Sequence, residues 1–179
     1  MRSNTIPGAL FLLASILSAS PPGMANAAPQ KKEYLSEAEA DKIREAGETG
    51  PRIVLFAAFA SDRIKKLQYE FAHFDPTDQK RTERLNGLLN AYTGCIDDAA
   101  DLIEIGIEKQ QDIRAGVKAM QAGIKEFLPY LQGLAANGPE HETYKQNLED
   151  AIESTQDAAK DVDKASKEMS SSPERRKPS

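Results

Sequence analysis

The chain has 179 residues, 28% of them charged, and a formal net charge of −5 at pH 7. This length suits one domain with a buried core. The acidic balance disfavours binding to nucleic acid and to anionic membrane surfaces, because both kinds of binding depend on clustered cations. We therefore expect a protein without a nucleic-acid partner.

The first 27 residues have the order of features found in a cleaved secretory signal peptide. Arg2 supplies a positive charge, residues 9–17 form a short apolar run, prolines at 21 and 22 break it, and Ala-Asn-Ala at 25–27 matches a signal-peptidase site. The apolar run has about half of the ~20 residues that span a bilayer, so we expect no permanent membrane anchor. We predict export to the periplasm or the extracellular space, with cleavage after Ala27.

A single helical-bundle domain is predicted over residues 36–169. Residues 28–35 are polar and are expected to form a flexible N-terminal segment, and residues 170–179 a disordered tail. Ser36 and Glu39 have the spacing of a capping box, which marks the start of a short helix.

Apolar residues recur at spacings of three and four along the rest of the domain, which is typical of helices with one buried stripe. The clearest positions are Ile53, Phe56, Ala60, Ile64, Leu85, Leu88, Tyr92, Ile96, Ile113, Val117, Met120, Ile124, Tyr144, Leu148 and Ile152. No segment shows the alternation typical of a strand. The sequence therefore predicts an all-α antiparallel amphipathic bundle of three to four long helices plus the short N-terminal helix.

The region from Gly106 to Asp112 leaves two interpretations open. Either a turn separates two helices there, or one helix continues for about 60 residues and about 90 Å. Because the region has neither a proline nor an Asn-Gly pair, we favour the continuous helix. Pro129 should kink this helix, since proline removes an amide hydrogen bond and crowds the carbonyl four residues earlier.

Glu70 and His73 have the E-x-x-H spacing that di-iron bundles use. Such sites need a second E-x-x-H pair and two further glutamates, but the residue three before His141 is Gly138. His73 also lies beside a predicted helix end, where we expect it to hydrogen-bond terminal carbonyls. Glu70 and His73 are thus weak metal-ligand candidates, and we expect no cofactor.

An acidic stripe follows one face of a predicted helix, and it consists of Asp97, Asp101, Glu104 and Glu108. The simplest interpretation is a solvent-exposed face whose charges are balanced by lysines on a neighbouring helix. The alternatives are a docking surface for a basic partner and a low-affinity cation site, although high-affinity cation sites usually draw ligands from a curved loop. We take the stripe as the candidate interaction surface.

Cys95 is the only cysteine, so the chain has no internal disulfide. Its spacing from Tyr92 and Ala99 places it on the apolar side of a helix, where it can pack as a small buried hydrophobe. The alternative is an intermolecular disulfide, because an odd cysteine in an oxidising compartment can pair between chains. If the chain is an enzyme with an unfamiliar site, Tyr92, Cys95, Asp97 and Asp101 are the residues to test.

These observations favour an exported helical-bundle protein that acts through protein–protein interaction, as a structural, adaptor or chaperone-like component. A homodimer is included, because long helices with many small apolar residues often complete their core by self-association. The alternative is a metal- or small-ligand-binding bundle that uses Glu70 and His73 or the acidic stripe. An enzyme is less favoured, since the sequence contains no G-x-S-x-G, P-loop or H-E-x-x-H motif.

Overall fold

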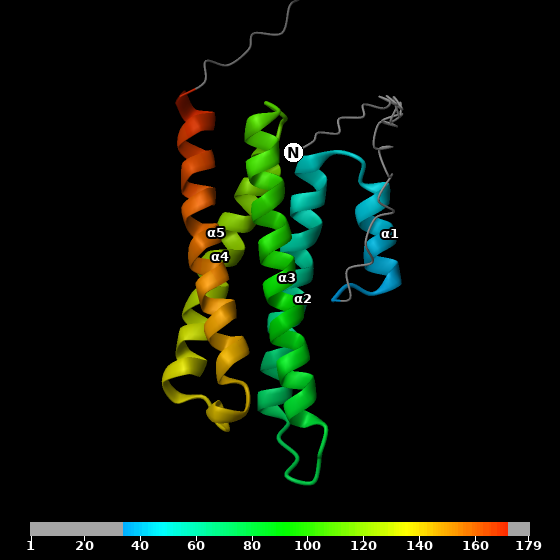
Figure 1. Ribbon diagram of the computed structural model, residues 1–179, viewed down its shortest axis with the longest axis vertical. Coiled ribbons are helices and arrows are strands. Elements are labelled where there is room, and N and C mark those ends of the chain that lie inside the picture. Colours follow the sequence, from blue (N-terminus) through cyan, green and yellow to red (C-terminus); the bar gives the residue numbers. More distant parts are fainter. Residues whose placement is uncertain (1–33, 172–179) are drawn as a thin grey trace, which may run out of the picture. The chain divides into compact units, whose positions relative to one another are not determined.

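The computed structural model describes residues 34–171, without the side chain of residue 171. The predicted signal peptide and residues 172–179 of the predicted tail lie outside the described residues. Within the described part every regular element is a helix, which confirms the all-α prediction. The elements in Figure 1 are α1 (Glu37–Glu45), α2 (Thr49–Ala72), α3 (Arg81–Glu108), α4 (Arg114–Asn137), a 3-10 turn (His141–Thr143) and α5 (Lys145–Ser171).

Helices α2 to α5 form a four-helix bundle of two layers, and α1 packs against α2. Each long helix has two main neighbours: α2 packs against α3 and α4, and α5 packs against the same two helices. The consecutive helices α3 and α4 lie across the diagonal from each other. In Figure 1, α3 and α5 lie in front of α2 and α4. We call these pairs the α3/α5 layer and the α2/α4 layer.

Consecutive long helices run in opposite directions, whereas the two helices of one layer run in the same direction. Gly116, near the start of α4, packs against Ile53, near the start of α2, so closely that a Cβ at Gly116 would lie 2.7 Å from the Ile53 Cβ. In the other layer, Asn147 near the start of α5 donates to Asn86 near the start of α3. The diagonal connection between α3 and α4 produces this arrangement, because it places α4 beside α2.

The core between the layers uses the apolar positions that the periodicity predicts, including Ile53, Leu85, Ile96, Val117 and Leu148. It also contains a polar pair: the Tyr92 hydroxyl lies 2.7 Å from Thr155 Oγ1, and Thr155 donates to the Ala151 carbonyl. Because the Thr155 proton is used in this way, Tyr92 is the donor to Thr155. Burial raises the pKa of Tyr92.

The prediction of a continuous helix is wrong, because residues 109–113 form a turn between α3 and α4. The end of α3 is a Schellman turn, in which the Gln111 amide donates to the Gly106 carbonyl at 2.8 Å and the Gln110 amide to the Ile107 carbonyl at 3.0 Å. Gln110 occupies the left-handed position, with a φ of 51°. Glycine usually fills that position, so the turn gave none of the signals on which the sequence interpretation depended.

The residues immediately before α1 pack onto the bundle. Leu35 is buried, and the Tyr34 ring lies against α3, where a Cβ on Gly94 would come within 2.7 Å of it. These two residues therefore have a defined place, in contrast to the flexible segment predicted over 28–35.

The start of α1 is fixed to α2 by an ion pair. Ser36 and Glu39 form the predicted capping box. Glu39 also accepts two hydrogen bonds from Arg63, at 2.5 and 2.8 Å, and the Arg63 side chain is only 7% exposed. Hydrogen bonding from Arg63 lowers the pKa of Glu39 to about 2.

Candidate functional site

The four carboxylates of the predicted acidic stripe lie on the outer side of α3, away from the α2/α4 layer. All four are exposed, whereas the opposite side of α3 carries its buried residues. The sequence from Leu85 to Glu108 contains no lysine or arginine. The Ser154 hydroxyl of α5 donates to Asp97, so the stripe lies next to α5.

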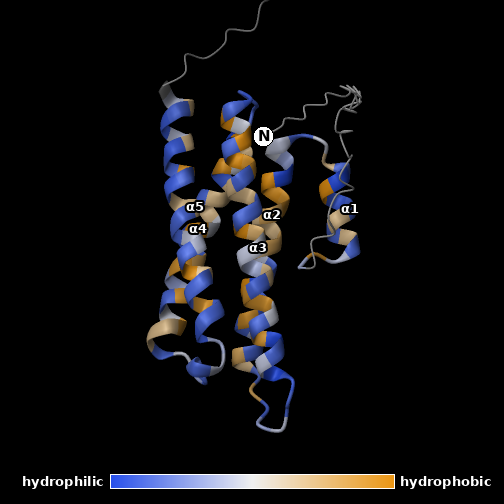
Figure 2. Cartoon of the chain, viewed as in Figure 1, coloured by the Kyte–Doolittle hydropathy of each residue, from blue (hydrophilic) through white to orange (hydrophobic). Residues whose placement is uncertain are grey.

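Helix α5 adds a second row of carboxylates beside the first. Their spacing places them on one side of α5, and the exposed members are Asp150, Glu153, Asp157, Asp161 and Glu168, with exposed Lys164 in the same row and Lys160 at its edge. The rows lie side by side because α3 and α5 run in the same direction, joined at Asn86–Asn147 and Asp97–Ser154. We call the nine carboxylates together the acidic face. Figure 2 shows α5 coloured mostly as hydrophilic.

Sequence reasoning missed the second row. The acidic spacing on the last helix was visible in the sequence, but the two rows are separated by more than 40 residues along the chain. Nothing in the periodicity indicated that the second and fourth long helices would be neighbours.

The acidic stripe on α3 lacks the cations that we expected opposite it. None of its four carboxylates forms an ion pair with a lysine or arginine of residues 34–171. On α5, Lys160 pairs with Asp157 at 2.5 Å. The expected lysines therefore form no ion pair with this stripe, although exposed Lys164 lies in the neighbouring row on α5 and Lys160 beside it.

Glu70 and His73 do not come together as metal ligands. Both oxygens of Glu70 accept hydrogen bonds from Arg84, at 3.0 and 2.9 Å, and these bonds lower the pKa of Glu70. His73 ends α2, where its Nδ1 lies 2.9 Å from the Tyr69 carbonyl, as expected for a histidine at a helix end. Among the described residues there is no group of three or more side chains that could hold a metal ion.

Arg81 connects the turns at the end of the bundle opposite the α3–α4 turn. Its side chain is 5% exposed, and its Nε donates to Glu140 at 2.9 Å. The guanidinium also lies over the rings of Phe71 and Phe74, 5.4 and 5.0 Å from their centroids. Sequence reasoning missed Arg81, because a charged residue at the start of a helix gives no sign of burial. Its contacts join the α2–α3 hairpin to the turn before α5.

The residues that we would test in an enzyme do not converge. Tyr92 and Cys95 are fully buried and face the core, whereas Asp97 and Asp101 are exposed on the opposite side of α3. The burial of Cys95 confirms that it packs as a small hydrophobe. A disulfide to a second chain would require the helices around Cys95 to separate.

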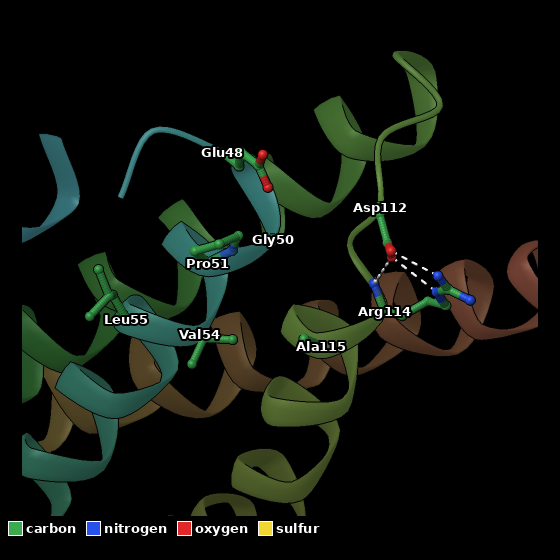
Figure 3. A pocket seen from close by; sticks show the side chains of 8 residues that line it. All are labelled: Glu48, Gly50, Pro51, Val54, Leu55, Asp112, Arg114 and Ala115. Carbon is green, nitrogen blue, oxygen red and sulfur yellow. Dashed lines mark hydrogen bonds and ion pairs between the residues drawn. The ribbon is translucent and has the colours of Figure 1, made fainter. Parts of the chain in front are cut away.

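An open hollow of about 700 Å³ lies between the start of α2 and the start of α4 (Figure 3). Arg114 donates to both oxygens of Asp112 at 3.0 and 2.8 Å, which lowers the pKa of Asp112 to about 2. The charges of Asp112 and Arg114 therefore neutralise each other at one side of the hollow. Most of the remaining wall is apolar, and it is formed by Gly50, Pro51, Val54, Leu55 and Ala115.

No helix of residues 34–171 is long and apolar enough to cross a bilayer. No protein family model, curated protein or solved structure matches the chain significantly. The assignment of a function therefore depends on the arrangement of the residues described above.

Proposed function

We propose that this chain is an exported helical-bundle protein that acts through protein–protein interaction, and that its acidic face binds a partner rich in lysine or arginine. A structural, adaptor or chaperone-like role would use such a face. The observation that supports this proposal is the double row of carboxylates on α3 and α5, in which the α3 row has no cation partner among the described residues. Nucleic acid and a permanent membrane anchor have no part in it.

The electrostatics of the acidic face favour a cationic partner. Carboxylates in adjacent rows repel one another, and the cations of a partner relieve this repulsion. A single exposed ion pair contributes only about 0.2–1 kcal/mol, so affinity requires several pairs. A one-signed face also speeds association with an oppositely charged surface. Binding should weaken as salt rises, because the Debye length falls from about 10 Å at 0.1 M to about 3 Å at 1 M.

Export is the second part of the proposal, and residues 1–27 support it. The expected mature chain begins at residue 28. N-terminal sequencing of the protein recovered from the exported fraction tests this point. An intact residue 1 on protein found only in the cytoplasm would contradict export.

The interaction is best tested by site-specific photo-crosslinking in the native exported fraction. Probes at Asp101 and Glu104 of α3 and at Asp157 of α5 should capture one dominant basic protein. A probe at Glu37 on α1 serves as the control, because this exposed residue lies off the acidic face. Equal capture from both sets of probes, or no capture from the acidic face, would contradict the proposal.

Matched charge variants then test whether the carboxylates bind. One variant neutralises the acidic stripe as amides (D97N, D101N, E104Q and E108Q). Its control neutralises four exposed glutamates elsewhere, Glu37, Glu45, Glu48 and Glu142, and so changes the net charge equally. We expect the stripe variant to lose at least ~10-fold in affinity at low salt and the control to lose little.

A further inference from the structure

Helix α1 and the two residues before it lie outside the four-helix bundle, beside α2 (Figure 1). We call residues 34–45 the strap. Of its side chains only Leu35 and Ile43 are buried, and most of the others are exposed. Helix α1 has nine residues, and isolated helices shorter than about 12–15 residues are marginal in water. The strap therefore depends on its contacts with the bundle.

The contacts of the strap centre on Arg63 of α2. Its guanidinium donates to both oxygens of Glu39 and, at 3.4 Å, to the Tyr34 carbonyl. Among the described residues, every hydrogen bond from Arg63 to a residue outside α2 goes to the strap. The guanidinium also lies 6.0 Å from the ring centroid of Phe59, one turn earlier on α2. On α3, the Tyr34 ring occupies the space that a side chain at Gly94 would fill. We call Phe59, Arg63 and Gly94 the strap site.

The connection between the strap and α2 has the geometry of a hinge. Gly47 holds a φ of 65°, and the Glu48 amide donates to the Ala46 carbonyl at 2.6 Å, which forms a γ-turn centred on Gly47. Turns of this kind are rare and strained. Both Gly47 and Glu48 are exposed, and a side chain at Gly47 would meet no part of the bundle. The turn is therefore free to change its conformation.

Directly after this turn, the start of α2 is fixed to the rest of the bundle. The Thr49 hydroxyl donates to the side chain of Gln111 in the α3–α4 turn. Gly50 is buried and packs so closely that a Cβ there would lie 2.6 Å from the Asp112 carbonyl oxygen. Movement of the strap can thus stop at the hinge and leave α2 in place.

We propose that the strap opens about Gly47 as one unit while the four-helix bundle stays folded, and that opening uncovers the strap site for a helix of a partner protein. The strap itself shows which helix fits. It presents a glutamate to Arg63, and the two buried aliphatic residues Leu35 and Ile43 each lie four residues from Glu39. A partner helix with a glutamate between two aliphatic residues meets the same contacts. The strap is then an autoinhibitory segment that competes with this helix.

Hydrogen exchange in the full chain tests the opening. The α1 amides, such as that of Ala40, which donates to the Ser36 carbonyl at 3.0 Å, should be protected at least ~10-fold less than the slowest amides of α3. Thr155→Val weakens the bundle in the α3/α5 layer. It should speed exchange in α3 at least ~5-fold and leave exchange in α1 unchanged. Equal protection of α1 and α3, or equal acceleration of both by Thr155→Val, would overturn the proposal.

A second variant distinguishes opening of the whole strap from fraying of the ends of α1. Arg63→Gln removes the cation of the strap site without changing the sequence of the strap. We expect it to speed the exchange of every α1 amide by the same factor, at least ~10-fold. An acceleration confined to the ends of α1 would mean that the strap does not move as a unit.

The probe for the strap site is a fluorescein-labelled peptide of residues 34–46, and its binding to the full chain is followed by anisotropy. Glu39→Gln in the chain weakens the competing strap, so it should raise the affinity for the peptide at least ~10-fold. Gly47→Ala, which strains the turn, is a second opened variant should Glu39→Gln fail to fold. Glu45→Gln, at an exposed position of α1, is the control and should leave the affinity unchanged.

The chemistry of the ligand is tested by changing the peptide instead of the chain. A peptide that carries Glu39→Gln should bind the opened chain at least ~10-fold more weakly than the unmodified peptide, because it cannot pair with Arg63. Equal binding of the two peptides, or no binding to either opened variant, would overturn the binding site. The strap site shares no residue with the acidic face, so neutralising the acidic stripe should change neither the exchange nor the peptide binding.

Discussion

The outer sides of the two layers differ in the charge of their exposed residues. The α3/α5 layer presents nine carboxylates with Lys160 and Lys164 beside them, whereas the exposed charges of the α2/α4 layer are mostly cations, Lys65, Lys66, Lys118 and Lys125 with Glu126. Both layers contribute to the same core, so packing alone does not require this difference. The outer sides of the two layers therefore differ in the sign of the charge that predominates on them, and only the α3/α5 side suits a basic partner.

Glu39 differs from the carboxylates of the acidic face because it is paired with a buried arginine. We expect its substitution to have the largest effect on the free energy of unfolding. Glu39→Gln removes the charge that answers Arg63, which is nearly buried. A buried cation that loses its anion is costly, but Arg63 keeps bonds to Asp62 and the Tyr34 carbonyl. We therefore expect a loss of about 2–3 kcal/mol in the free energy of unfolding, measured with urea. Glu45→Gln, on the exposed side of the same helix, should change this free energy by less than about 0.5 kcal/mol.

The same ion pair predicts a pH dependence. The pKa of Glu39 is lowered from 4.5 to about 2, so its stabilisation is fully present above pH 4.5 and is lost as the pH falls toward 2. The difference in unfolding free energy between the unmodified chain and Glu39→Gln should shrink over that interval. A constant difference from pH 6 to pH 2 would show that the ion pair is not its source.

The α3/α5 layer is held together by buried contacts, although its surface charges repel. Thr155→Val keeps the shape of the side chain but leaves the Tyr92 hydroxyl buried without its acceptor. We expect a loss of about 1–3 kcal/mol in unfolding free energy, and about 1 kcal/mol for Tyr92→Phe, which removes the hydroxyl itself. Thr82→Val, at an exposed position of α3, is the control. Equal effects of Thr155→Val and Thr82→Val would contradict the role of the buried pair.

Neutralising carboxylates on the acidic face should stabilise the fold, which is the opposite sign to Glu39→Gln. Glu104 and Glu108 lie in the last turns of α3, which contain no basic residue to offset the negative end of the helix dipole. We expect the double variant E104Q/E108Q to gain about 1 kcal/mol at low salt, with a smaller gain at 1 M salt. Glu83→Gln, in the first turn of the same helix, should lose a few tenths of a kcal/mol. A salt-independent gain would contradict an electrostatic cause.

Most of the fold was predictable because the signals for a helix come from residues a few positions apart in the sequence. The capping box at Ser36 and the buried positions such as Ile96 follow from spacings of a few residues. Pro129 lies inside α4, which continues past it, and the kink expected there stays a prediction. The packing of α3 beside α5 was not predictable from the sequence. A short turn such as the one between α3 and α4 can lead either to an adjacent or to a diagonal helix. The acidic face depends on that packing, so only the α3 half of the face was found from the sequence. The buried arginines were missed for another reason, because Arg63 and Arg81 pair with Glu39 and Glu140, which are distant in the sequence.

The smallest effect on the free energy of unfolding is expected in the turn between α3 and α4. Gln110 holds a φ of 51°, which costs a residue with a Cβ more than it costs glycine. Gln110→Gly should therefore raise the free energy of unfolding by about 0.5–1 kcal/mol, as measured by urea denaturation. Lys109→Gly is the matched control, because Lys109 has a φ of −86° and only the flexibility of the unfolded chain would change there. Since neither variant touches the acidic face, partner binding should stay as it is. A loss of stability in Gln110→Gly equal to that in Lys109→Gly would mean that the left-handed residue does not limit this turn.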